Sequence, residues 1–230
     1  MLKHLPDSAK SFLLKIFNKI WETGILPPSW KIAIVVPVKK PNKDPYHPAS
    51  YRPISLTSCV CKLFEKIVNT RLMWHLERYG LLSSVQFGFR KDRSTLDPLL
   101  RLSSHIQHGF SNRCQTIGVF FDLQKAYDTT WKYGIIKRFH EMGIRGKMPT
   151  FIHSFLSDRY IKVRVGNILS NPYELEEGVS QGSVLSVTCF AVAINSIVNS
   201  VSPPVKSSLF VDDLAIYVTS YDAVAACNFL

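Results

Sequence analysis

A pair of adjacent acids interrupts an otherwise apolar stretch near the end of the chain. Residues 208–217 read SLFVDDLAIY, and the two apolar flanks are rich in β-branched and aromatic residues. Both flanks are too short for helices, so the pattern predicts a strand, a tight turn and a second strand. Side chains alternate between the two faces of a strand, so consecutive acids serve one site only where a turn breaks that alternation. Asp212 and Asp213 are therefore expected at the turn, where their carboxylates suit a divalent metal.

A second acid follows an apolar run of the same kind. Asp is also a favoured residue of ordinary turns, so the Asp212-Asp213 pair alone fits a simple hairpin better than a metal site. Residues 116–122 read TIGVFFD, which predicts a strand that is buried on both faces and ends in Asp122. Side by side in one sheet, the two runs would bring the three carboxylates together. Such carboxylates repel one another unless cations bind between them, so two Mg²⁺ ions about 4 Å apart are expected, as in phosphoryl transfer.

Five motifs occur in a fixed order along the chain. They read YRPISL at 51–56, QFGFRK at 86–91, FDLQKAYD at 121–128, GVSQGSVLS at 178–186 and FVDD at 210–213. On these motifs the chain resembles the reverse transcriptases of non-LTR retrotransposons, particularly the jockey-like elements of animal genomes. The likeness covers nearly all of the chain and is strongest from Ile32 to Tyr217. The chain departs from the pattern of that family at Asp92, Ser180, Val187 and Val211, where Gly, Pro, Pro and Ala are usual.

The resemblance implies an α+β fold, the right-hand polymerase palm, in which helices back an antiparallel sheet, together with fingers. Residues 1–95 would form an N-terminal helix and the fingers. Residues 96–230 would form the palm, with a return to the fingers over about 130–175. The thumb of that family would be missing, because only 17 residues follow Asp213.

The resemblance also implies an activity, RNA-directed DNA polymerase. A primer 3′-hydroxyl would attack the α-phosphate of a dNTP, with Asp122, Asp212 and Asp213 as catalytic residues that hold two Mg²⁺ ions, or Mn²⁺ as their substitute. The implied partners are an RNA template, a DNA primer and dNTPs, without a membrane, and the implied location is the nucleus and cytoplasm. The alternative is a remnant that binds nucleic acid without catalysis, which the departures and the early end of the chain favour.

Six residues are candidates for contacts with the dNTP. The polar loop after strand 32–36 and the return strand 51–56 predict a basic hairpin tip, where a guanidinium fork matches phosphate oxygens better than a lysine does. A tyrosine five residues after the first acid resembles the aromatic that lies beneath the incoming sugar, although core packing is the alternative. A loop glutamine resembles a nucleotide contact but could also cap the following helix. The six are Lys39, Lys40, Arg52, Arg90, Tyr127 and Gln181.

Charge and composition narrow the functional class. The chain carries a net charge of +11, and Lys31–Arg93 alone holds 12 Lys or Arg against 4 Asp or Glu. Such a segment is the electrostatic footprint of a polyanion partner, with a solvated surface as the alternative. Five irregularly spaced cysteines fit neither a disulfide framework nor a zinc site. No run approaches the roughly 20 apolar residues that span a bilayer.

Helical spacing marks several further segments, which are expected to cover the sheets. Apolar residues recur with a helical period over 9–20, 60–76, 99–106 and 131–142, and 184–198 is apolar almost all round. Residues 160–165 alternate as a strand does. In the motif at 86–91, Gly88 is expected to let the backbone approach another segment closely, while Phe87 and Phe89 suit either base stacking or packing.

Overall fold

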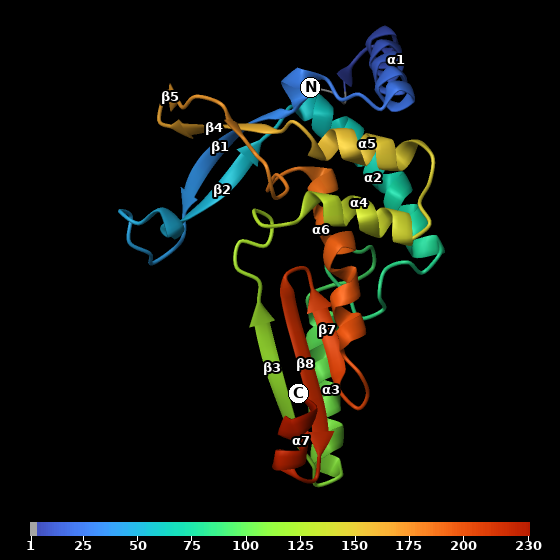
Figure 1. Cartoon of the computed structure of the whole chain (residues 1–230), viewed down its shortest axis with the longest axis vertical. Helices are drawn as coiled ribbons and strands as arrows, with labels where there is room; N and C mark the ends of the chain where they lie inside the picture. The colour runs from blue at the N-terminus through green and yellow to red at the C-terminus, as the bar shows by residue number, and fades with distance from the viewer. Residues whose placement is uncertain (1–3) are drawn as a thin grey trace. The chain divides into compact units, whose positions relative to one another are not determined.

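The computed structural model describes residues 4–230, which form two compact units (Figure 1). The first unit contains the residues up to Thr70 together with Tyr127–Ser186. The second contains Arg71–Ala126 and Val187–Leu230. The chain therefore leaves the first unit, returns to it and leaves it again. The boundary between the two compact units lies near residue 70. The predicted boundary between fingers and palm at residue 95, with a return to the fingers at about 130–175, stays a prediction.

The first unit is built on a mixed five-stranded sheet. Its order is β2-β1-β4-β5, with β6 also paired to β4. β1 runs antiparallel to β2 and parallel to β4, so the strands predicted at 32–36, 51–56 and 160–165 are confirmed and adjacent. The strands are β1 (Ile32–Lys39), β2 (Tyr51–Leu56), β4 (Tyr160–Val165), β5 (Ile168–Leu169) and β6 (Tyr173–Glu174).

Aromatic packing joins the helices of the first unit. The ring of Phe64 stacks on Phe17 with centroids 5.0 Å apart and meets Phe151 edge-on at 5.4 Å. All three side chains are buried, so they form the centre of this core. The helical elements are α1 (Asp7–Thr23), η2 (Pro28–Trp30), η3 (Pro48–Ser50), α2 (Cys59–Arg78), which continues past Thr70, α4 (Lys132–Glu141) and α5 (Lys147–Leu156).

The second unit is built on a three-stranded antiparallel sheet. β8 (Asp213–Ser220) lies between β3 (Gln115–Asp122) and β7 (Lys206–Phe210), side by side in Figure 1. Helical elements lie along the sheet. They are α3 (Leu96–Ser111), the end of α6 (Val184–Ile194), η4 (Asn195–Ser200) and α7 (Ala223–Phe229). An antiparallel sheet backed by helices is the α+β palm arrangement that the sequence predicts.

Alternate residues of β8 pack on opposite sides of this sheet. Leu214 and Ile216 join Leu209 and Val198 in one buried apolar cluster. On the other side, the ring of Tyr217 lies 5.0 Å from that of His105 on α3. β8 is therefore covered on both faces, as a continuous apolar run predicts. Within residues 4–230, no helix is both long enough and apolar enough to cross a bilayer.

β3 differs from the prediction. The apolar run before Asp122 predicts a strand buried on both faces, but β3 is an edge strand whose side chains are largely exposed. Val119, Phe120 and Phe121 are 38%, 71% and 45% exposed. The prediction of burial was wrong because an apolar run shows that burial is favourable but does not identify the segment that would provide it.

Candidate functional site

The register of the second sheet brings the three predicted acids to one end of it. Phe210 pairs with Asp213, so Val211 and Asp212 form a two-residue connection between β7 and β8. Asp122 pairs directly with Asp213 across β3 and β8. Residues in direct register lie about 5 Å apart on the same face of the sheet. The acids therefore lie together at one end of the sheet, which is the arrangement that the two apolar runs predict.

The carboxylates act on one another electrostatically. Burial, and then the charges of Asp212 and Asp122, raise the pKa of Asp213 above its ordinary value. A carboxyl whose ionisation is disfavoured in this way is stabilised in its charged form by a nearby cation. Mg²⁺ typically binds one or two carboxylates and keeps water or phosphate as further ligands. The donor chemistry therefore fits a divalent ion. Among residues 4–230, no group of three or more His, Cys, Asp or Glu is placed to hold a metal ion, so the three acids share one end of the sheet without forming a preformed metal site.

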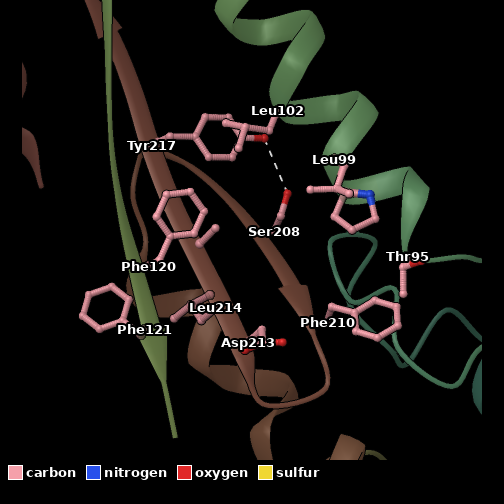
Figure 2. Close-up of a pocket in the computed structure, with 12 residues that line it drawn as sticks. Thr95, Leu99, Leu102, Phe120, Phe121, Ser208, Phe210, Asp213, Leu214 and Tyr217 are labelled. Carbon is pink, nitrogen blue, oxygen red and sulfur yellow. Dashed lines mark hydrogen bonds between the residues drawn. The ribbon is translucent and has the colours of Figure 1, made fainter. Parts of the chain in front are cut away.

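An apolar pocket of about 350 Å³ borders the acids within the second unit (Figure 2). It lies between α3 and the sheet, and Asp213 is the only charged residue among those that line it. The hydroxyls of Ser208 and Tyr217 lie 3.5 Å apart inside it, as the dashed line in Figure 2 shows. Asp213 is thus exposed to an apolar surface on one side, which explains why desolvation is the largest cause of its raised pKa.

In the first unit, the loop 178–183 connects three of the predicted nucleotide-binding segments. The Val179 N–H donates to the Tyr127 carbonyl at 2.7 Å, and the Ser55 N–H donates to the Gln181 carbonyl at 2.8 Å. Ser55 belongs to β2, the strand that also carries Arg52. The backbone of this loop therefore fixes the positions of Tyr127, Gln181 and β2 relative to one another.

A close backbone approach requires glycine in this loop. Gly182 has φ +121°, and a Cβ built there would lie 2.7 Å from the Ser55 carbonyl oxygen. A side chain at this position would both strain the backbone and break the loop away from β2. The glycine next to Gln181 is therefore a geometric requirement of the contact with β2.

A buried glutamate that the sequence analysis missed holds the end of this loop. Glu65 on α2 is 0% exposed, and its Oε2 accepts from the Ser183 hydroxyl at 2.6 Å. The same oxygen accepts from the backbone N–H groups of Val184 and Leu185 at 2.8 and 3.2 Å. Glu65 therefore caps the N-terminus of α6, where a negative charge is favourable. The helix cap that was left open as an alternative for Gln181 is provided by Glu65.

Two further buried groups surround Glu65. Cys61 donates to Glu65 Oε1 at 3.3 Å, and burial, then the charge of Glu65, raise the pKa of this thiol strongly. Arg159 is buried as well, and burial lowers its pKa while the charge of Glu65 opposes that change. Glu65 follows Cys61 by four residues and precedes Val68 by three, so it lies on the buried stripe of α2. An acid in an apolar stripe was the available signal.

The basic candidates of the hairpin tip lie where the sequence predicts. Val38 of β1 pairs with Arg52 of β2, and Lys39 pairs with Tyr51. Arg52 and Lys39 are exposed, while the Lys40 ammonium donates to the Ala49 carbonyl at 3.1 Å. Arg52 and Lys39 are thus available to an anion, whereas Lys40 is partly engaged with its own loop.

Arg90 is held by an ion pair and two carbonyl contacts. Its guanidinium donates to both carboxylate oxygens of Glu77 at 2.7 and 2.6 Å and to the carbonyls of Ser83 and Gln86. The side chain is 8% exposed. These contacts give Arg90 a structural function within the second unit, and its contact with the dNTP stays a prediction. Phe87 is buried under Arg93, which favours packing, and Phe89 is exposed.

Comparisons with known proteins agree on one family. Residues 38–228 match the family model described as "Reverse transcriptase (RNA-dependent DNA polymerase)". The chain is 37% identical over 191 residues to the probable RNA-directed DNA polymerase from transposon BS of Drosophila melanogaster, which covers 83% of this chain and 21% of that protein. It is 30% identical over 233 residues to the RNA-directed DNA polymerase from mobile element jockey of the same species, covering 99% of this chain and 25% of that protein.

A solved structure shows the same fold at low identity. Apo telomerase from Candida tropicalis, truncated from its C-terminal domain, superposes with a TM-score of 0.62 at 13% identity. The match covers 92% of this chain and 49% of that one. The chain spans about a fifth to a quarter of the two Drosophila relatives.

Proposed function

Because the chain belongs to the reverse transcriptase (RNA-dependent DNA polymerase) family, we propose that it forms the metal-binding and nucleotide-binding part of an RNA-directed DNA polymerase. One observation carries the proposal. The register of β3 against β8 sets Asp122 opposite Asp213, with Asp212 in the adjoining turn. Two sequence segments about 90 residues apart thus supply acids to the same end of one sheet, which an ordinary hairpin turn does not require.

The proposed reaction is nucleotidyl transfer. The oxygen of a primer 3′-hydroxyl loses its proton to water and forms a bond to the α-phosphorus of a dNTP. The bond between that phosphorus and the oxygen bridging to the β-phosphate breaks, and pyrophosphate leaves with the electron pair. Two Mg²⁺ ions, or Mn²⁺ in their place, would lower the pKa of the attacking hydroxyl and stabilise the charge on the leaving group. Asp122, Asp212 and Asp213 would hold these ions, and no residue forms a covalent bond to the substrate.

Residues of the first unit are proposed to orient the nucleotide. Arg52 and Lys39 would bind the triphosphate, with a smaller share for Lys40. The ring of Tyr127 would lie against the sugar, and Gln181 would contact the nucleotide from the loop 178–183. Support comes from the backbone hydrogen bonds that tie Tyr127, Gln181 and β2 to this one loop.

The proposed partners are an RNA template, a DNA primer and dNTPs. The basic excess of Lys31–Arg93 supports a phosphate-rich partner, since bound Lys and Arg release counterions from nucleic acid. By resemblance to its family, the protein would act inside the cell, in the nucleus and cytoplasm. A remnant that binds nucleic acid without catalysis is the second candidate, and the departures from the family pattern, such as Val211 beside the acids, favour it.

Primer extension on an RNA template with Mg²⁺ tests the proposal. Asp212→Asn keeps the shape of the side chain but removes its charge, so extension should fall by about a thousandfold or more. RNA binding should stay within about twofold. The matched control is Asp7→Asn, which removes an exposed acid from α1 and should leave extension unchanged. Extension by Asp212→Asn at the unaltered rate would refute the metal site, and binding without any extension by the unaltered chain would favour the remnant.

A further inference from the structure

Gln86 is a fully buried polar residue that contacts the turn 210–213, which carries two of the proposed metal ligands and is called the metal-site turn below. Its side chain is 0% exposed, and its Oε1 accepts from the Gly88 N–H at 3.0 Å and from the Val211 N–H at 3.3 Å. Val211 immediately precedes Asp212. One side-chain oxygen therefore joins the loop 86–90 to the turn that carries the acids, and all of these residues belong to the second unit.

The turn needs an external contact because its backbone is strained. Val211 has φ 60°, in the left-handed region that a β-branched residue rarely adopts. A two-residue hairpin connection favours Gly where its first residue has positive φ, so Val here raises the energy of the native turn. A conformation of this kind persists only where the surrounding structure enforces it.

The loop 86–90 provides that enforcement at close range. A Cβ built on Gly88 would lie 2.5 Å from Val211 Cγ2 and 2.7 Å from the Val211 nitrogen. Only glycine lets the two backbones come this near. The expectation that Gly88 permits a close approach is thereby confirmed, and the segment it approaches is the metal-site turn.

The position of Gln86 is itself fixed by backbone and ionic contacts. The Phe87 N–H donates to the Leu209 carbonyl at 2.8 Å, and the Leu209 N–H donates to the Val85 carbonyl at 2.9 Å, which forms a short parallel bridge to β7. Arg90, held by Glu77, donates to the Gln86 carbonyl at 3.0 Å. The backbone that carries the Gln86 side chain is therefore fixed relative to β7.

The amide nitrogen of Gln86 raises the question of why an uncharged glutamine, and not a glutamate, occupies this position. Gln86 Nε2 is buried without a hydrogen-bond partner among residues 4–230. A glutamate of the same shape would accept both N–H groups and bury no unused donor. It would also place a negative charge next to Asp212, in a turn whose acids already lie opposite Asp122. The uncharged acceptor holds the turn without adding to that repulsion.

We propose that Gln86 is a positioning residue of the metal site, which holds Val211 at positive φ and thereby directs Asp212 and Asp213 toward Asp122. It does not touch substrate or metal. The inference rests on the proposed function, because it assumes that the acids bind a divalent ion.

Mn²⁺ titration of the nucleic-acid-free chain by calorimetry tests this inference. Gln86→Met keeps length and apolarity but lacks the acceptor, so the Kd for Mn²⁺ should rise by at least about tenfold. Gln107→Met, an exposed position on α3, is the matched control and should leave the Kd unchanged. In a Val211→Gly background, Gln86→Met should raise the Kd by less than about threefold, because Gly adopts positive φ without a clash. A folded Gln86→Met chain with unaltered Mn²⁺ affinity would overturn the inference.

Hydrogen exchange on the unaltered chain gives a second readout that needs no variant. The amide protons of Gly88 and Val211 should exchange far more slowly than those of an exposed turn, with or without Mn²⁺. Rapid exchange at Val211 would refute the contact even if Gln86→Met fails to fold. Protected amides in a chain that binds no Mn²⁺ would instead refute the proposed metal site and leave the contact intact.

Discussion

The loop 178–183 of the first unit and the turn 210–213 of the second are held in similar ways by different chemistry. Each is anchored by one buried side chain more than 100 residues away in sequence, Glu65 for the loop and Gln86 for the turn. Each anchor uses a single oxygen to accept several donors. The loop is held by a charged acceptor and the turn by a neutral one.

The charge of each anchor matches its surroundings. Glu65 lies near the buried cation Arg159 and at a helix N-terminus, both of which stabilise a carboxylate. Gln86 lies beside a turn that already carries two acids and faces a third. A buried acceptor is therefore charged where positive charge surrounds it and neutral where negative charge does.

The largest expected effect comes from removing the charged anchor. Glu65→Leu leaves the Ser183 hydroxyl and two backbone N–H groups without an acceptor. It also removes the negative charge that compensates the buried positive charge of Arg159. Loss of one partner from a buried charged network costs about 3–5 kcal/mol of unfolding free energy. Urea unfolding measures the loss.

Two variants control that measurement. Glu65→Gln keeps an acceptor oxygen and should lose less stability than Glu65→Leu, while Glu22→Leu at an exposed position should change it by about 0.5 kcal/mol or less. Equal losses for Glu65→Leu and Glu22→Leu would show that the loop does not depend on its anchor.

A smaller effect is expected when the neutral anchor is given a charge. Gln86→Glu should lower the unfolding free energy at pH 7 by about 1–3 kcal/mol, because an ionised carboxylate is buried beside acids. Burial and the neighbouring acids raise the pKa of the new carboxyl in the folded state. The deficit is therefore present at neutral pH and shrinks as pH falls through that raised pKa.

Urea unfolding at pH 7 and pH 5, with and without Mn²⁺, measures this deficit. Mn²⁺ should restore part of the stability at pH 7, and Gln107→Glu on the exposed side of α3 serves as the control. A deficit independent of both pH and Mn²⁺ would contradict an electrostatic reason for glutamine at this position.

The smallest effect concerns the thiol beside the charged anchor. Burial and Glu65 raise the pKa of Cys61 above its ordinary value of 9.0, so the folded chain keeps the thiol protonated where the unfolded chain ionises. Stability should then fall as pH rises above 9, by about 1 kcal/mol between pH 9 and pH 10 from this group. The difference between the unaltered chain and Cys61→Ala, followed by urea unfolding across that range, isolates the effect. An identical pH dependence in both would contradict it.

The parts of the fold that the sequence predicted are those with a local signal. The hairpin around Asp212 and the strand ending in Asp122 both follow from short apolar runs, and antiparallel pairing then brings the acids together. The resemblance to a known family supplied the candidates Tyr127 and Gln181, which residue spacing alone left open.

The partners of the anchors had no such local signal, although an acid in an apolar helical stripe marks Glu65 itself. The contact of Glu65 with Ser183 and that of Gln86 with Val211 join residues 118 and 125 positions apart, and neither spacing nor composition specifies such pairs. Arg90 shows the same limit, because a basic residue in a motif indicates charge but not that Glu77 already neutralises it.

The exposed apolar side chains of β3 also bear on how the protein behaves at high concentration. An edge strand whose backbone is open on one side and whose side chains are Val119, Phe120 and Phe121 is a template for pairing with another extended chain. Its segment 116–121 carries no charge and no proline to prevent such stacking. Asp122 ends the strand with a charge, so the acid that we propose as a metal ligand would also oppose such stacking at that end.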